Sequence, residues 1–162
     1  MNEELRRLFE ADQQDRAGGT FAPETAERDG LRRLRVTELL AAGDVEDAED
    51  LFHAAMIFQH GSSLEDYWQA HELAEASAAA GYRPGRWLAA AAYDRWLMHQ
   101  GKPQRFGTQY FAMGGELPGL WEVDPATTDD ERAEHDVPPL HEALDRVGGR
   151  VEPARLIVGG TP

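Results

Sequence analysis

Four glycines divide much of this chain into segments that can each form one helix, which strongly limits the folds it can adopt. Gly43, Gly61, Gly81 and Gly101 each follow a stretch with helical patterning, and glycine commonly follows a helix C-terminus. The last three such helices are of similar length and are joined by short links. We therefore predict an all-α fold, a compact antiparallel helical bundle with helical-hairpin stacking as in tetratricopeptide folds, although no second copy of a 34-residue signature is present.

The predicted helices begin at recognisable capping residues. Asn2 caps the first, Asp44 caps the third, and Ser62 with Glu65 forms a capping box for the fourth. Pro84 opens the fifth, where a first-turn proline is tolerated. The resulting helices cover residues 2–16, 24–42, 44–60, 62–81 and 84–100.

The pattern weakens after residue 107. Residues 108–113 can form a short extended segment, and residues 127–135 and 139–147 can each form a short helix. We predict one helical domain over residues 1–147 and a loosely ordered C-terminal tail over residues 148–162.

Composition limits the classes of function. The net charge of −14 argues against nucleic-acid binding, which needs a basic surface. No apolar run approaches the roughly 20 residues of a membrane span and no leader peptide is visible, so we expect no membrane partner and a cytoplasmic location. The chain has no cysteine, so any metal would be held by His, Asp or Glu.

Residues 67–111 differ from the rest of the chain in charge. They hold five basic and three acidic residues, a local net charge of +2, together with all four tyrosines and three of the four tryptophans. Such a segment can form a pocket for a small anionic or planar ligand. It can equally form the core, with the charged ends of Arg and Lys reaching solvent.

Asp94 is the most informative single residue. On a helix through residues 86–100 its carboxylate lies on the apolar face, next to Trp87, Ala90, Ala91, Leu97 and Met98. A carboxylate in that position has to be paired, hydrogen-bonded or protonated. Asp94 is therefore a candidate general acid or base, or a group that orients His60 or His71 for that role.

The histidines are the other candidate site residues. His53 and His60 lie seven residues apart and share one face of their helix, whereas His71 lies in the apolar stripe of the next helix. His53 and His60 can belong to an exposed polar face, and His71 can be an ordinary core histidine. Alternatively, a transition metal can be bound by His53, His60 and His71, although the His-Glu-x-x-His and paired Glu-x-x-His motifs are absent.

Several short motifs occur in a fixed order. They are Asp12-Gln13, Asp15-Arg16, Gln59-His60, Asp94-Arg95 and the run 101–109, which contains Gln104 and Gly107-Thr108-Gln109. In this order they resemble a bacterial family of small domains of unknown function, over roughly residues 1–110. The resemblance implies a helical domain in which the Gln-His, Asp-Arg and Gly-Thr-Gln elements act together, and it implies no activity.

Two functions are consistent with these residues. The first is a polar pocket for a small polar or anionic ligand, in an enzyme of hydrolase or acyl-transfer type that uses His60 or Asp94 for proton transfer. Its ligand-binding candidates are Gln59, His71, Arg95, Gln104, Thr108 and Gln109. The second is a helical protein-interaction or homodimerisation module, in which the Asp, Arg and Gln side chains form a structural network and Trp68, Trp87 and Tyr110 line a groove or a homo-oligomer face.

Overall fold

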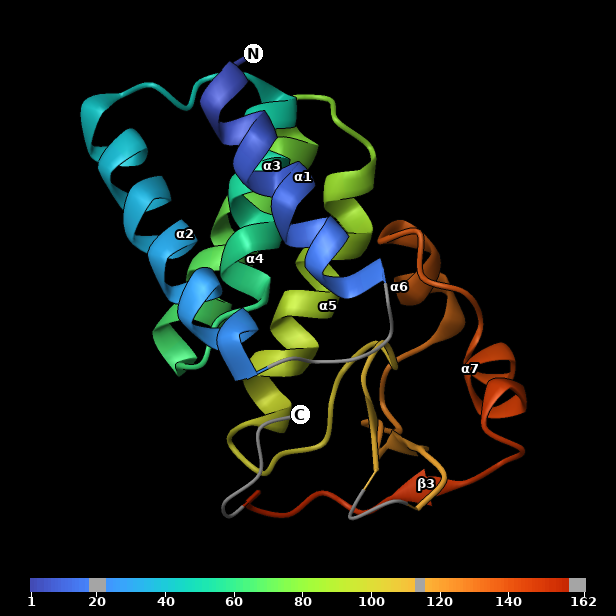
Figure 1. Cartoon of the computed structure of the whole chain (residues 1–162). Coiled ribbons are helices and arrows are strands. Elements are labelled where there is room, and N and C mark those ends of the chain that lie inside the picture. The colour runs from blue at the N-terminus through green and yellow to red at the C-terminus, as the bar shows by residue number, and fades with distance from the viewer. Residues whose placement is uncertain (18–22, 113–115, 158–162) are drawn as a thin grey trace. The chain divides into compact units, whose positions relative to one another are not determined.

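Helices make up most of the chain (Figure 1). The computed structural model describes residues 1–17, 23–112 and 116–157. Its helices are α1 (Glu3–Ala17), α2 (Pro23–Ala42), α3 (Ala48–Gln59), α4 (Leu64–Ala79), α5 (Pro84–Met98), α6 (Asp129–Glu134) and α7 (Leu140–Arg146). Its strands are β1 (Tyr110–Phe111), β2 (Gly119–Trp121) and β3 (Val151–Glu152). The prediction of a mostly helical protein is therefore confirmed, with a small sheet in addition.

Contacts between residues group the chain into two units. The N-terminal unit is Met1–Leu88 and the C-terminal unit is Ala89–Pro162, so the boundary falls within α5. The sequence predicted one domain over residues 1–147 and a loose tail from residue 148. In the structure, part of that tail belongs to the C-terminal unit, because β3 pairs with β2.

The N-terminal unit is built around α3 and α4, which pack along each other, and both α1 and α2 contact α3 (Figure 1). Both helices bury small residues, namely Ala54 and Ala55 of α3 and Ala70 and Ala74 of α4. Small side chains allow two helix axes to approach closely. Larger apolar side chains complete this core, namely Leu5, Val36, Leu39, Ile57, Phe58, Tyr67 and Leu88.

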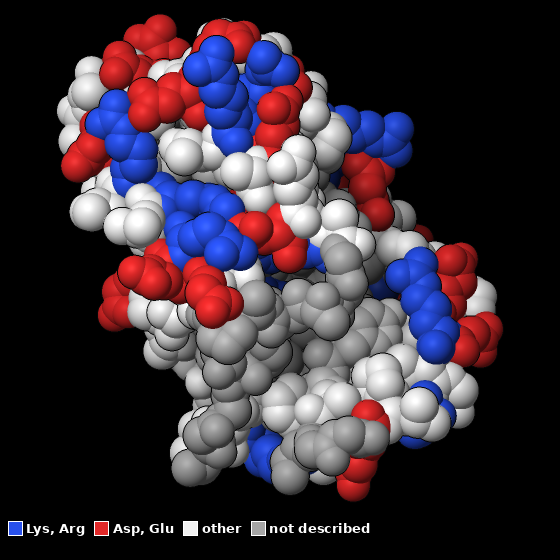
Figure 2. All heavy atoms as spheres, in the orientation of Figure 1, with Lys and Arg blue, Asp and Glu red and all other residues white. Residues whose placement is uncertain are grey.

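Ion pairs lie on the surface of α1 and α2, where basic side chains are found beside acidic ones (Figure 2). Arg35 contacts Glu4 at 2.6 Å and Glu38 at 2.6 Å, and Arg28 contacts Asp15 at 2.9 Å. Exposed pairs of this kind add little to stability individually. The pairs of Arg35 with Glu4 and of Arg28 with Asp15 join α2 to α1, so they favour the orientation in which these charged faces of the two helices meet.

Three of the predicted glycine stops have the geometry of helix C-terminal caps. Gly43, Gly81 and Gly101 all have positive φ. After Gly43, the amide of Asp44 donates to the carbonyl of Leu39 at 3.0 Å, which is the hydrogen bond of a Schellman motif. Asp44 therefore completes the end of α2, and its predicted role as the N-cap of α3 is wrong; Asp47 holds that position.

The capping box of α4 lies one residue later than predicted. Ser63 Oγ accepts from the amide of Asp66 at 3.1 Å, and the Asp66 carboxylate accepts from the amides of Ser62 at 2.9 Å and Ser63 at 3.2 Å. The serine and the acid keep the same spacing as in the predicted Ser62 and Glu65 pair. A Cβ at Gly61 would lie 2.2 Å from Asp66 Cβ, so this glycine leaves room for the cap.

The C-terminal unit combines the end of α5 with a three-stranded sheet in the order β1-β2-β3. β1 and β2 are antiparallel, with Tyr110 opposite Leu120, and β2 and β3 are parallel, with Leu120 opposite Val151. The predicted extended segment at 108–113 thus contains β1, and the two predicted short helices are α6 and α7. Two buried clusters support these elements: Ala90, Phe106 and Val137, and Leu120, Ala143 and Val147.

Among the described residues, no helix is long and apolar enough to cross a membrane.

Gly85 tests the close packing of α4 and α5. A Cβ at this position would lie 2.7 Å from the carbonyl oxygen of Ala74 and 2.8 Å from the amide nitrogen of Ala78. Because both are backbone atoms that cannot rotate away, we expect Gly85→Ala to lower the free energy of unfolding by about 1–3 kcal/mol. Urea denaturation followed by circular dichroism measures this change.

Gly30, in the middle of α2, provides the control, since a Cβ there would meet nothing within 4 Å. We expect Gly30→Ala to raise the free energy of unfolding by about 0.5–1 kcal/mol, because alanine favours the helix. Equal effects of the two substitutions would contradict the packing described for Gly85.

Candidate functional site

The Asp94 carboxylate is fully buried and accepts hydrogen bonds from four consecutive residues. Oδ1 accepts from the amides of Arg105 at 2.7 Å and Phe106 at 2.9 Å. Oδ2 accepts from the amides of Gly107 and Thr108, both at 3.0 Å, and from Thr108 Oγ1 at 2.8 Å. Asp94 lies at 0% exposure on α5, as the helical pattern predicted. The carboxylate therefore fastens the loop after α5 to the helix.

Burial raises the pKa of the Asp94 carboxyl, and the hydrogen bonds from Phe106 and Thr108 act in the opposite direction. Every group that contacts the two oxygens through these bonds is a donor. Within residues 1–17, 23–112 and 116–157, neither oxygen is bonded to an acceptor side chain. This arrangement suits a structural carboxylate better than a general acid or base.

Gln104 and Gln109 extend the same network. Gln104, at 0% exposure, donates from Nε2 to the carbonyls of Gln109 at 2.9 Å and Trp121 at 2.7 Å, and its Oε1 accepts from the amide of Gln109 at 2.8 Å. Gln109 donates to Thr108 Oγ1 at 3.0 Å and accepts from Arg95 Nε at 3.0 Å. The structure thus brings five predicted site residues together in the C-terminal unit: Asp94, Arg95, Gln104, Thr108 and Gln109.

His60 lies in the N-terminal unit, at the end of α3, and pairs with Asp12 of α1. His60 Nδ1 is 2.9 Å from Asp12 Oδ2 and 3.1 Å from Oδ1. Asp12 is 1% exposed, whereas the His60 side chain is 17% exposed. The histidine therefore has access to solvent while its partner has almost none.

Further ionic contacts hold Asp12 in place. Arg16 Nη1 donates to Asp12 Oδ1 at 2.9 Å and Arg16 Nη2 to Asp29 Oδ2 at 2.7 Å; Arg32 Nη1 donates to Asp29 Oδ1 at 2.8 Å. We call Asp12, Arg16, Asp29 and Arg32 the ion-pair chain. Asp29 is 4% and Arg32 7% exposed, and buried charges of this kind are stable only when they are paired. Gln13 Nε2 also donates to Asp12 at 2.8 Å.

The contact with Asp12 determines what His60 can do. Because Nδ1 faces a carboxylate, this nitrogen carries a proton, and in neutral His60 the lone pair is then on Nε2. Within residues 1–17, 23–112 and 116–157, Nε2 has no hydrogen-bond partner. An imidazole with a fixed tautomer and an open Nε2 can accept a proton or attack an electrophile.

Asp12, Asp29 and Arg32 were not predicted as site residues from the sequence. Asp12 and Arg16 entered only as parts of the family-like motifs. Asp12 and His60 are 48 residues apart, and no periodicity within one helix relates them. One signal was available in the sequence. Asp12 and Arg16 are four residues apart in α1, a spacing that favours an ion pair between them.

The other predicted histidines lie elsewhere in the N-terminal unit. His53 is 4% exposed, so the exposed-face interpretation is wrong for this residue; its ring stacks on Phe9 with centroids 4.3 Å apart. Burial lowers the pKa of His53, and Glu49 partly offsets the shift. His71 is half-buried beside Trp68, with ring centroids 5.2 Å apart.

Gln59 is buried at the end of α3. Its predicted role in ligand binding stays a prediction, as does that of His71.

The predicted metal ligands do not form a cluster. In the part of the chain that the structure describes, no three His, Asp or Glu side chains are grouped so that they could hold a metal ion. His53 Nε2 has Glu49 at 3.9 Å, and His60 Nδ1 is used by Asp12. The geometry therefore gives no support to a site made from His53, His60 and His71.

Comparisons with protein-family models, with curated proteins and with solved structures give no match.

Asp94→Asn tests whether the Asp94 carboxylate is structural. An amide can replace one oxygen, but its NH₂ group would face two of the backbone donors and leave them unsatisfied in a buried position. We expect a loss of about 3–5 kcal/mol in the free energy of unfolding, measured by urea denaturation.

The matched control is Asp145→Asn, because Asp145 is exposed on α7. We expect this change to stay within about 0.5 kcal/mol of the original protein. An effect of Asp94→Asn as mild as that of the control would show that the Asp94 carboxylate does not hold the loop.

Proposed function

We propose that the protein is an enzyme of hydrolase or acyl-transfer type in which His60 transfers protons, acting on a small polar or anionic substrate. The observation that supports this proposal is the contact between the buried Asp12 carboxylate and His60 Nδ1 at 2.9 Å. A histidine oriented by a buried carboxylate is the arrangement that general-base catalysis uses on several unrelated folds.

The proposed step is a proton transfer through His60 Nε2. Nε2 takes the proton of a water or hydroxyl nucleophile as that oxygen attacks the carbonyl carbon of the substrate. The resulting imidazolium is stabilised by the Asp12 carboxylate, which Arg16 keeps in position at 2.9 Å. His60 then returns the proton to the leaving group as the bond to it breaks, so that the histidine is regenerated.

His60, not Asp94, is the proton-transfer group in this proposal. Both Asp94 oxygens accept hydrogen bonds from residues 105–108, whereas His60 Nε2 is open within the described residues. Asp12 is a positioning residue, since it acts through His60. Ligand binding by Arg95, Gln104, Thr108 and Gln109 stays a prediction, because their side chains make hydrogen bonds within the C-terminal unit.

Diethyl pyrocarbonate tests whether His60 has a reactive lone pair on Nε2, because this reagent acylates unprotonated imidazole nitrogens. We expect His60 to be acylated at neutral pH, and Asp12→Asn to slow this reaction at least about tenfold, because the oriented tautomer is lost. Mass spectrometry of peptides measures the rate at each histidine.

His141 is the internal control, since it is exposed on α7 and its acylation should not change in the Asp12→Asn variant. With activated esters as substrates, His60→Ala should lower hydrolysis by about 100-fold or more. Equal acylation of His60 with and without the Asp12 carboxylate would contradict the proposed role.

The second candidate is a helical protein-interaction or homodimerisation module, with hairpins that stack as in tetratricopeptide folds. Apolar exposure in the N-terminal unit favours it. Leu31 and Leu34 of α2 are 62% and 60% exposed, and Trp87 of α5 is 42% exposed. Large exposed apolar side chains are common at interfaces. Tyr110, predicted to line such a groove, is half-buried and packs against the cluster of Leu120, Ala143 and Val147; its part in an interface stays a prediction.

Light scattering after size-exclusion chromatography tests the module. If the exposed apolar residues form a dimer face, the original protein should have twice the mass of its 18.0 kDa chain, and Trp87→Ser should reduce that mass to one chain without changing the free energy of unfolding. Leu117→Ser is the control, because Leu117 is 69% exposed in the C-terminal unit. A protein that is monomeric before substitution would exclude the homodimer.

A further inference from the structure

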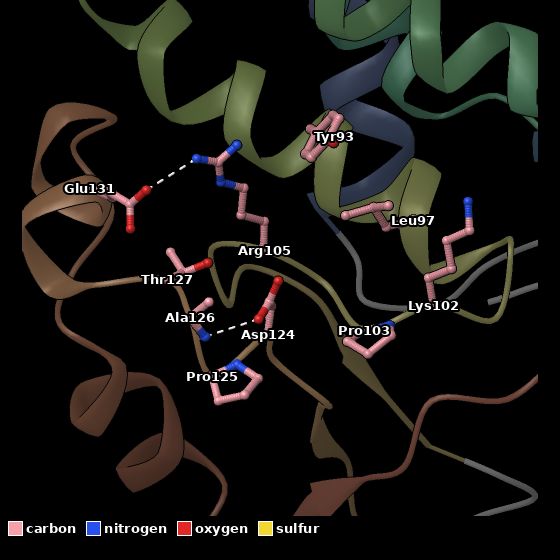
Figure 3. Close-up of a pocket in the computed structure, with 10 residues that line it drawn as sticks. All are labelled: Tyr93, Leu97, Lys102, Pro103, Arg105, Asp124, Pro125, Ala126, Thr127 and Glu131. Carbon is pink, nitrogen blue, oxygen red and sulfur yellow. Dashed lines mark hydrogen bonds and ion pairs between the residues drawn. The ribbon is translucent and has the colours of Figure 1, made fainter.

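A cleft of about 570 Å³ lies within the C-terminal unit (Figure 3). Its walls come from the end of α5, from the loop after α5, from the segment after β2 and from α6. None of its lining residues belongs to the pair formed by Asp12 and His60 or was predicted as a site residue. Its volume is in the range of clefts that bind small organic ligands.

One side of the cleft is apolar. Tyr93 and Leu97 of α5 and Pro103 of the following loop lie along it (Figure 3). The Tyr93 ring is stacked on Trp96 with centroids 5.7 Å apart and meets Phe106 edge-on at 6.5 Å. A ring held in this way offers a ligand a fixed aromatic surface.

Two basic side chains line the cleft. The Arg105 guanidinium lies 5.3 Å above the Phe106 ring and contacts Glu131 at 3.1 Å. Arg105 and Glu131 are 48% and 38% exposed, so solvent already weakens their attraction and Arg105 can bind a ligand carboxylate at little cost. Lys102 Nζ donates to Gln100 at 2.8 Å, which leaves ammonium protons for a second contact.

Two acidic side chains line it as well. One oxygen of Asp124 accepts from the amide of Ala126 at 2.9 Å, and the other points away from that turn (Figure 3). Glu131 is engaged by the capping box of α6, in which it accepts from the amide of Thr128 at 2.8 Å. Asp124 is therefore the acid that can accept a hydrogen bond from a ligand ammonium group.

The residues around the cleft are held in place before a ligand arrives. Asp94 fixes the backbone of residues 105–108. The amide of Gln104 donates to the carbonyl of Glu122 at 2.8 Å, and the carbonyl of Gln104 accepts from the amide of Asp124 at 2.8 Å. Arg105 and Asp124 are thus attached to adjoining, hydrogen-bonded segments, which lowers the entropic cost of binding.

We propose that this cleft binds a short peptide with free termini and an aliphatic or aromatic side chain. The ligand carboxylate would pair with Arg105, its ammonium with Asp124, and its side chain would lie against Tyr93 and Leu97. A plain anion would be repelled by Asp124 and Glu131, and a plain cation by Lys102 and Arg105. A ligand that carries both charges around an apolar group matches the lining on every side.

The test is a titration of the ¹⁵N-labelled full chain with the dipeptide alanyl-phenylalanine, followed by NMR. We expect saturable shifts of the amides of Lys102, residues 104–106, Asp124, Ala126 and Thr127; Pro103 and Pro125 have no amide proton. Arg105→Gln and Asp124→Asn should each weaken binding about tenfold, the effect of losing one charge-assisted hydrogen bond. The matched controls Arg146→Gln and Asp145→Asn, both exposed on α7, should leave the dissociation constant unchanged.

Blocked probes separate charge recognition from apolar contact. N-acetylation and C-amidation of the dipeptide should each weaken binding about tenfold, like the two cleft substitutions. Absence of saturable shifts at about 10 mM dipeptide would overturn the proposal. Equal binding of the blocked and free dipeptides would also overturn it, because the cleft would then select only for the apolar side chain.

Discussion

Asp94 is a carboxylate that the fold has to satisfy, since a buried carboxylate without partners costs several kcal/mol or more. The chain satisfies it by turning residues 105–108 around its two oxygens. That turn places Phe106 in the buried cluster with Ala90 and Val137. Gln104, just before the turn, donates to the backbone of Gln109, next to β1, and of Trp121, in β2. The small sheet and one wall of the cleft therefore depend on a single side chain of α5. This explains how a short sheet, which would be marginal alone, is stable beside a helix.

The buried carboxylates Asp94 and Asp12 differ in the groups that satisfy them. Asp94 accepts from backbone amides and one hydroxyl, and these donors cannot release a proton near neutral pH. Asp12 accepts from titratable and charged side chains, His60 and Arg16. A carboxylate bonded to an imidazole can stabilise that imidazole in its protonated form, whereas one bonded to amides can only hold a loop. The same residue type thus fastens a loop to a helix in one unit and is paired with a histidine and an arginine in the other.

The sequence predicted the features that depend on one helix at a time. The position of Asp94 on the buried face of α5 follows from helical periodicity, and the stop at Gly43 follows from the glycine signal. The exact capping residues were less predictable. Asp44 is suited both to the end of α2 and to the start of α3, and its role depends on the backbone conformation between the two helices, which the sequence pattern does not give. The pairing of Asp12 with His60 depends on how α1 packs against α3. The periodicity of residues within one helix gives no information on that packing. This pair was therefore missed, although each of its residues lies in one of the short motifs.

The net charge of −14 bears on which ligands either proposed site can accept. At physiological salt the field of such a surface is screened over about 8 Å, so it opposes an approaching anion mainly close to the protein. Arg16 is bonded to Asp12 and Asp29, and Arg33, whose Nη1 donates to the carbonyl of His60 at 3.2 Å, has its Nε 3.4 Å from Asp66, so both of these positive charges are paired with carboxylates. At the cleft, Arg105 is balanced by Glu131. Multiply charged anions are therefore disfavoured at both places. The step proposed for His60 needs an electrophilic centre and a proton path and no strong positive field, so a neutral polar substrate would satisfy it as well as a singly charged anion.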